Sequence, residues 1–181
     1  MKSRLLPLIA VFIWGSLSLP VLADSAGQEK AGAAIEKTSD EPLKRFDGHW
    51  QGEGKFFGMD ATVQSKWEWL LAGKFLRLVV SYEMRSSDGK KQTFEGHAYY
   101  QAKGNGQYEG RWFDSQGNAY PVRATLEGNT LTSLWGEAGK ADGKSTYRIN
   151  EADKSLEIVD STRQKDGSWK EFSRFRLQLN R

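Results

Sequence analysis

Cysteine is absent from this 181-residue chain, and its absence excludes several kinds of protein. Without a thiol the chain has no disulfide, no thiolate metal ligand and no cysteine to carry a lipid anchor. Histidine is nearly as scarce, because His49 and His97 are the two copies in the sequence. A zinc site requires three or four close ligands, so we expect no metal site. The core alone must hold the fold together.

Long apolar runs are also scarce. One such run, Leu5–Leu19, follows two basic residues, and Val21-Leu22-Ala23 then resembles a signal peptidase site. The run falls short of the roughly 20 apolar residues that a comfortable membrane span requires. We therefore predict that residues 1–23 are a signal peptide, the alternative being an uncleaved anchor. The protein is then exported, to a bacterial periplasm or outside the cell, with no transmembrane segment after cleavage.

Blocks of like charge are missing as well. The signal holds two of the 26 basic residues and none of the 23 acidic ones, which leaves residues 24–181 with a net charge of +1. A near-neutral, evenly mixed surface offers no electrostatic footprint for DNA or RNA. We expect no nucleic-acid partner, and no attraction to anionic membranes.

The remaining chain consists of two segments that differ in amino-acid composition. Residues 24–45 are rich in small and charged residues and predict a flexible leader, although residues 42–46 suit one helical turn with Leu43 and Phe46 facing a core. Residues 46–181 form the predicted domain. Turn dipeptides recur there between aromatic and β-branched runs, and no 12-residue stretch keeps a helical apolar period. The predicted strands are 49–57, 61–71, 74–85, 91–101, 107–114, 119–126, 130–137, 144–150, 155–164 and 168–179.

Short links predict that neighbouring strands pair antiparallel, which gives an all-β fold, an up-and-down barrel of about ten strands. A three-residue loop at 87–89 sets Tyr82 opposite Phe94, both on the inward face. A two-residue Asp166-Gly167 turn sets Asp160 opposite Ser173 and Thr162 opposite Glu171. All four of these polar residues then face inward near one end of the last hairpin.

Gly48-His49-Trp50 opens the first strand, and Gly52 and Gly54 follow it. The tryptophan is suited to plug one end of a barrel, while the glycines permit close strand crossing. An arginine of the last strand is expected to stack on the indole, with Arg181 best placed and Arg174 and Arg176 the alternatives. We therefore predict that Gly48, Trp50 and Arg181 close the barrel.

These residues resemble the Gly-x-Trp motif of the calycin superfamily, the lipocalins and fatty-acid-binding proteins. The ordered set is also similar to a bacterial exported family of unknown function with a lipocalin-like barrel, and distantly to nitrobindin-type haem barrels. The motifs that carry the resemblance are Trp50-x-Gly52-x-Gly54, Leu71-x-Gly73-x-Phe75-Leu76, Tyr108-x-Gly110-x-Trp112-Phe113-Asp114-x-x-Gly117 and Asp166-Gly167-x-Trp169. The resemblance implies a barrel but no settled activity.

Two departures limit what the resemblance implies. Residues 58–60 alone join the first two predicted strands, so the lid helices of fatty-acid-binding proteins are missing. Nitrobindin-type barrels bind haem through a histidine near the C-terminus, whereas residues 168–179 contain no histidine, cysteine or methionine. We expect no cofactor. His97 is expected on the outer surface beside Glu95.

The inward face supplies the candidate site. Dense aromatic side chains either fill a barrel or line a pocket for an apolar ligand. Inward polar groups indicate a wet cavity, a ligand mouth, or a strand that flares into solvent. The favoured function is binding of a small apolar or amphipathic ligand; the alternatives are a filled interaction module and an enzyme that uses interior carboxylates. The side chains expected to bind the ligand are Tyr82, Tyr100, Trp112, Asp160, Glu171 and Ser173.

Overall fold

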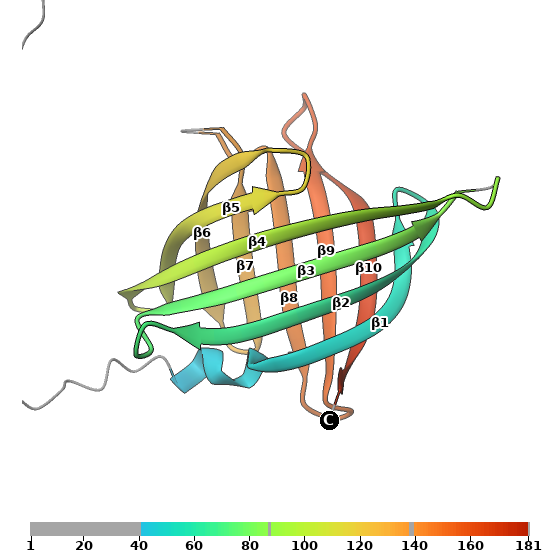
Figure 1. Cartoon of the computed structure of the whole chain (residues 1–181). Helices are drawn as coiled ribbons and strands as arrows, with labels where there is room; N and C mark the ends of the chain where they lie inside the picture. Colours follow the sequence, from blue (N-terminus) through green and yellow to red (C-terminus); the bar gives the residue numbers. More distant parts are fainter. Residues whose placement is uncertain (1–40, 87, 138–139, 181) are drawn as a thin grey trace, which may run out of the picture. The chain divides into compact units, whose positions relative to one another are not determined.

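The computed structural model describes residues 41–86, 88–137 and 140–180. They form one short 3-10 helix, η1 (Glu41–Phe46), and a closed antiparallel barrel in which sequence neighbours pair and β1 pairs with β10 (Figure 1). The ten-stranded all-β barrel predicted from the sequence is therefore confirmed. Its strands are β1 (Gly48–Phe56), β2 (Met59–Leu70), β3 (Phe75–Arg85), β4 (Lys91–Gly104), β5 (Gln107–Asp114), β6 (Ala119–Glu127), β7 (Thr130–Trp135), β8 (Gly143–Asn150), β9 (Ser155–Arg163) and β10 (Trp169–Asn180).

The two ends of the barrel differ. The helix end contains η1, the start of β1 and the turns β2–β3, β4–β5, β6–β7 and β8–β9 (Figure 1). The opposite end, called the mouth below, contains the other five connections, from the β1–β2 turn to the β9–β10 hairpin. Leu43 and Phe46 of η1 are completely buried, as the sequence predicted, and Trp50 donates its indole N–H to the Phe46 carbonyl at 2.8 Å. These side chains fill the helix end.

Alternation of side chains between the two faces explains why these segments form strands. In β3 every second residue is buried, from Leu76 to Met84. The predicted β3–β4 register is confirmed, with Tyr82 opposite Phe94, and the Ser86 amide donates to the Lys90 carbonyl across the predicted loop. At this hairpin the loop sequence and the alternation of inward-facing residues therefore specify the same register.

Glycines allow β1 to approach β10 closely where the barrel closes. A Cβ atom on Gly52 would lie 2.0 Å from the Arg176 carbonyl oxygen, and one on Gly54 equally close to that of Arg174. Gly48 adopts φ +120°, which other residues rarely do. The expected arginine stack is wrong for Arg174 and Arg176, because both point outward and pair with carboxylates. Arg181 lies outside the described residues.

The last hairpin corrects one prediction. Its loop holds three residues, 165–167, with Gly167 at φ +84°, so Arg163 pairs with Trp169. A β-bulge at Phe172 absorbs the extra residue, after which Asp160 pairs with Ser173 as predicted. Before the bulge the register differs by one, so Glu171 faces Ser161 instead of Thr162. Because a one-residue shift moves a side chain to the other face, Glu171 points outward, with 44% of its side chain exposed.

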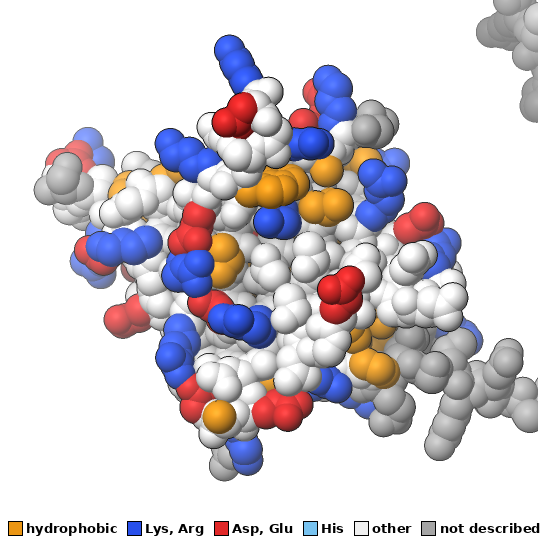
Figure 2. All heavy atoms as spheres, turned by 180° about the vertical axis from the view of Figure 1, so that it is seen from behind, with side chains coloured by type: hydrophobic (Ala, Val, Ile, Leu, Met, Phe, Trp, Pro, Cys, Tyr) orange, Lys and Arg blue, Asp and Glu red, His pale blue; other side chains and the backbone are white. Residues whose placement is uncertain are grey.

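Charged side chains of both signs are mixed on the outer face. Figure 2 shows this on the side opposite to the view of Figure 1, where red and blue side chains alternate and no large area carries a single sign. Several of them form ion pairs: Arg174 pairs with Glu157 on the neighbouring strand β9 and with Glu171 on its own strand. In the described part of the chain, no helix combines the length and apolar character needed to cross a membrane.

Candidate functional site

A row of polar side chains crosses four neighbouring strands inside the barrel. Ser133 of β7 pairs with Ser145 of β8, Ser145 with Asp160 of β9, and Asp160 with Ser173 of β10. All four are buried, with exposed fractions of 6% or less. Polar side chains rarely share one inward row of a barrel unless each finds a partner, so this row is the most unusual feature of the interior.

Asp160 is the centre of this row. Its Oδ2 accepts a hydrogen bond from the Ser173 hydroxyl at 2.5 Å and from the Tyr82 hydroxyl, which reaches across from β3, at 3.5 Å. Burial raises the pKa of Asp160 above its usual range, while the hydroxyls of Ser145, Ser173 and Tyr82 oppose the rise. The described structure gives this carboxyl no basic partner.

Two further tyrosines complete the group. The hydroxyls of Tyr100 and Ser133 lie 3.0 Å apart, and the Trp135 indole donates to Ser145 at 3.0 Å. Burial raises the pKa of Tyr100 to about 12 and that of Tyr147 well above the usual tyrosine range, so both phenols are neutral at ordinary pH. The name polar belt is used below for the seven residues Tyr82, Tyr100, Ser133, Ser145, Tyr147, Asp160 and Ser173.

Three buried polar atoms of β2 have no protein partner in the described structure, namely those of Ser65, Trp67 and Trp69. The Ser65 hydroxyl and the Trp67 indole N–H are both buried and unpaired. Trp67 lies against Tyr147 in an edge contact with ring centroids 5.0 Å apart, which places the indole beside the polar belt. Buried polar groups in proteins are almost always paired, so these unpaired atoms are a further unusual polar feature of the interior.

Half-buried aromatic rings surround the interior at the mouth. Phe56 packs against Tyr82 with ring centroids 4.9 Å apart, and Phe94 stacks on Trp112 at 6.5 Å. Trp112 lies over Gly96, where a Cβ would approach its ring to 2.1 Å. The interior therefore changes along its axis from apolar at the helix end, through the polar belt, to aromatic at the mouth.

A hollow of about 590 Å³ lies at the rim of the mouth, between the β1–β2 turn and the β9–β10 hairpin. Phe57 and Phe172 stack there with centroids 4.6 Å apart, and Phe57 is 62% exposed. Thr162 and Ser173 also line the hollow, so it borders the polar belt. Glu171 belongs to this hollow and not to the interior; Arg174 donates two hydrogen bonds to its carboxylate, which lowers its pKa.

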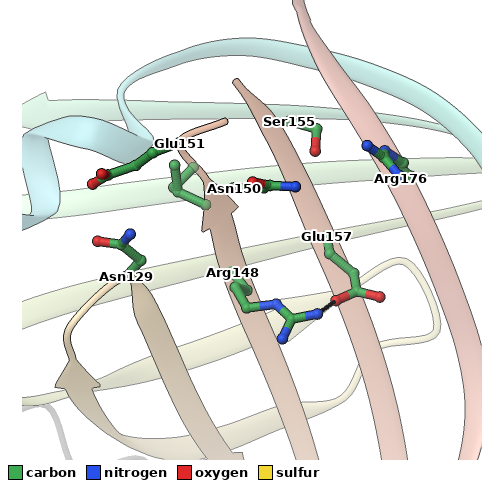
Figure 3. Close-up of a pocket in the computed structure, with 8 residues that line it drawn as sticks. Asn129, Arg148, Asn150, Glu151, Ser155, Glu157 and Arg176 are labelled. Atoms are coloured by element: carbon green, nitrogen blue, oxygen red, sulfur yellow. Dashed lines mark hydrogen bonds and ion pairs between the residues drawn. The ribbon is translucent and has the colours of Figure 1, made fainter. Parts of the chain in front are cut away.

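A second hollow, of about 450 Å³, lies on the outer face near the helix end (Figure 3). Arg148 and Glu157 point toward one another in it and form an ion pair. Arg176 pairs with Asp153, outside the hollow. The charged side chains of this hollow are therefore already paired with other side chains. We expect them to contribute little to the binding of a charged ligand.

The structure brings together five of the six predicted ligand-binding residues. Asp160, Ser173, Tyr82 and Tyr100 belong to the polar belt, and Trp112 lies above it at the mouth. Glu171 is the exception, because the bulge turns it outward. Sequence reasoning missed Ser133, Ser145 and Tyr147. A usable signal existed, since each lies on the inward parity of its strand, next to Leu131 or Ile149.

Neither histidine faces the interior. His49 is exposed, and His97 lies on the outer face with its Nε2 atom 2.9 Å from Glu95, as predicted. A haem held by histidine would therefore have no protein ligand in the barrel. Among the residues that the structure describes, no cluster of three or more potential metal ligands occurs.

Comparison with known proteins supports the fold of this protein and does not place it in a family. No protein-family model matches the chain, and no curated protein matches it. Among solved structures, the chain is similar to the crystal structure of Rv2717c from M. tuberculosis, with a TM-score of 0.57 and 17% identity over 78% of this chain and 96% of that chain. A de novo designed fluorescence-activating β-barrel gives a TM-score of 0.39 at 14% identity over 76% of this chain and 96% of the design. The first likeness supports the barrel fold alone.

Proposed function

We propose that this protein is an exported barrel that binds a small apolar or amphipathic molecule inside its mouth. The observation that carries the proposal is the polar belt, in which Asp160 lies buried without a basic partner. Half-buried aromatic rings lie between this belt and the solvent at the mouth. A barrel that served only as a rigid scaffold would gain stability from apolar side chains at these positions, since burying polar groups is costly. Their presence suits recognition of the polar group of a ligand.

Ten strands also enclose a wider interior than eight do, and eight already suffice to hold one small ligand. The helix end is filled by Phe46, Trp50 and Trp67, so a ligand would occupy the half of the interior nearer the mouth. The rim hollow, which Ser173 also lines, lies at the same end of the barrel and is where we expect a ligand to enter.

The enzyme alternative loses its main support. It required Asp160 and Glu171 together as an interior pair of carboxylates, and the bulge places them on opposite faces of the sheet. Acid–base chemistry by two carboxylates needs both beside the same substrate. The alternative of a filled interaction module is favoured by one observation, the exposed Phe57 stacked on Phe172 at the rim.

Binding of a neutral environment-sensitive dye such as Nile red to the purified protein tests the proposal. We expect saturable fluorescence enhancement with energy transfer from tryptophan. Ser133→Phe, which places a ring in the polar belt, should abolish binding, whereas Phe57→Ala at the rim should leave binding unchanged. If Phe57→Ala abolishes dye binding and Ser133→Phe does not, the interior is not the site, and the interaction module is the better description. Thermal unfolding of both variants serves as the control that each is folded.

Export is proposed from residues 1–23, which lie outside the described residues. Expression of the full chain in a Gram-negative host, followed by fractionation and N-terminal sequencing, tests it. The expected product is periplasmic and begins at Asp24. Ala23→Trp, which puts a bulky side chain at the cleavage position, should leave the chain uncleaved and attached to the membrane. A wild-type chain recovered intact from the cytoplasm would contradict the proposal.

A further inference from the structure

The charge of the barrel interior is unusual because it has one sign. Among the described residues, the buried polar side chains are serines, tyrosines and Asp160, and no lysine, arginine or histidine is buried. Lys170, which pairs with Thr162 at the rim, is exposed. An anionic ligand would therefore find a carboxyl inside the barrel and no cation to neutralise it, which is costly in a low-dielectric interior.

Asp160 keeps capacity for one more donor. An ionised carboxylate has about four acceptor positions on its two oxygens. The hydroxyls of Tyr82, Ser145 and Ser173 are the donors that the described structure gives it, and the bonds from Tyr82 and Ser173 both end on Oδ2. At least one acceptor position is thus left for a donor that is not part of the protein.

Aromatic rings gather beside this carboxyl. The Tyr82 ring, whose hydroxyl faces Asp160, has its centroid 4.9 Å from that of Phe56, 6.0 Å from that of Phe94 and 5.2 Å from that of Phe175. The faces of aromatic rings attract cations, and the attraction strengthens where water is excluded. A carboxylate beside several rings is the environment that a protonated amine prefers.

We infer that the interior binds an organic amine, with its ammonium group on Asp160 and its apolar body against the rings of Tyr82, Phe56 and Phe94. This assignment rests on the proposed function and narrows it from an apolar or amphipathic molecule to a cationic one. It also predicts rejection of fatty acids and other anionic amphiphiles. The ammonium group supplies the positively charged partner that Asp160 lacks in the described structure, and it donates a hydrogen bond to the remaining acceptor position of the carboxylate.

Amine binding must then depend on pH. The titratable groups that face Asp160 are Tyr82 from β3, Tyr100 from β4 and Tyr147 from β8, and all three phenols remain neutral because burial raises their pKa. Asp160 itself is the interior group that titrates at lower pH. Since an ammonium group prefers the ionised carboxylate, affinity should fall as the pH is lowered through the pKa of Asp160.

Three probes with the same twelve-carbon chain test the inference: dodecylamine, dodecanol and dodecanoate, each below its critical micelle concentration. Their affinities are measured by displacement of Nile red and by calorimetry on the mature protein. We expect dodecylamine to bind at least about tenfold more tightly than dodecanoate, with dodecanol between them. Asp160→Asn should weaken dodecylamine about tenfold or more and change dodecanol by less than about twofold.

Glu171→Gln is the matched control, because it makes the same change on the outer face of the same hairpin. It should leave all three affinities unaltered. Dodecanoate binding as tightly as dodecylamine, or dodecylamine insensitive to Asp160→Asn, would overturn the amine assignment while leaving a ligand-binding barrel in place. If none of the probes, nor the dye, binds inside the barrel, the proposed function fails and the inference fails with it.

Discussion

Ser173 and Asp160 face each other across β9 and β10, with the serine hydroxyl 2.5 Å from the Asp160 Oδ2 atom. This contact joins the first residue after the β-bulge to the one carboxyl buried in the described part of the barrel. It therefore connects the irregular geometry of the last hairpin to the chemistry of the interior.

Removing that hydroxyl should destabilise the folded protein. Ser173→Ala leaves the carboxylate with one donor fewer, so the pKa of Asp160 should rise further and the free energy of unfolding at neutral pH should fall by about 1 to 3 kcal/mol. Urea unfolding measures the stability, and NMR titration of the Asp160 carboxyl carbon measures the pKa. Ser81→Ala, on the outer side of β3, serves as the control and should cost about 0.5 kcal/mol or less. An unchanged pKa in Ser173→Ala would argue against the contact.

Asp160 should make the protein less stable as the pH rises. Its folded pKa lies above its unfolded value, so between the two values the folded state holds a proton that the unfolded state has lost. The free energy of unfolding therefore declines as the pH rises through this window. Asp160→Asn removes the effect, so its stability relative to wild type should be greater at neutral pH than in acid.

Chemical unfolding of both proteins from about pH 3 to about pH 8 measures this difference. Exposed carboxyls such as Asp88 and Asp166, whose pKa values are lowered by their hydrogen bonds, act in the opposite direction but equally in both proteins. The stability of Asp160→Asn minus that of wild type, plotted against pH, therefore reports the contribution of Asp160 alone. A curve that is flat, or that rises toward acid, would contradict a raised pKa.

Closure of the barrel should depend on the glycines of β1. Gly52→Ala places a Cβ about 2.0 Å from the Arg176 carbonyl oxygen, so β1 and β10 must separate. We expect a loss of at least about 3 kcal/mol in the free energy of unfolding, or failure to fold. Gly58→Ala is the comparison: its Cβ meets nothing within 4 Å, and its cost of about 1 kcal/mol comes from φ +78° alone. Equal losses in the two variants would show that the close approach is not limiting.

The plug at the helix end should matter more than the aromatic pair at the rim. Phe46→Ala removes a completely buried ring that lies 5.3 Å from Trp67, and should cost about 3 to 5 kcal/mol. Phe57→Ala makes the same change at a side chain that is 62% exposed, and should cost about 1 kcal/mol or less. Thermal unfolding compares the two. If the costs were similar, η1 would not contribute to the core.

Much of this architecture was accessible from the sequence. The strand positions, the inward faces and the β3–β4 register follow from alternation and from turn residues within a few positions of each other. The burial of Leu43 and Phe46 was predicted in the same way. Part of the site followed too, since Asp160, Ser173, Tyr82 and Tyr100 lie on the inward faces that the pattern assigned.

Tertiary structure alone decided the rest. The sequence did not reveal that the 165–167 loop holds three residues, because Asp-Gly is compatible with loops of two or three. That one residue, taken up at Phe172, turned Glu171 out of the interior. The grouping of Ser133, Ser145 and Tyr147 around Asp160 was equally hidden, since it depends on the registers of three neighbouring strands, β7, β8 and β9. Local patterns determine which face a side chain takes, whereas contacts across the barrel depend on closure and register.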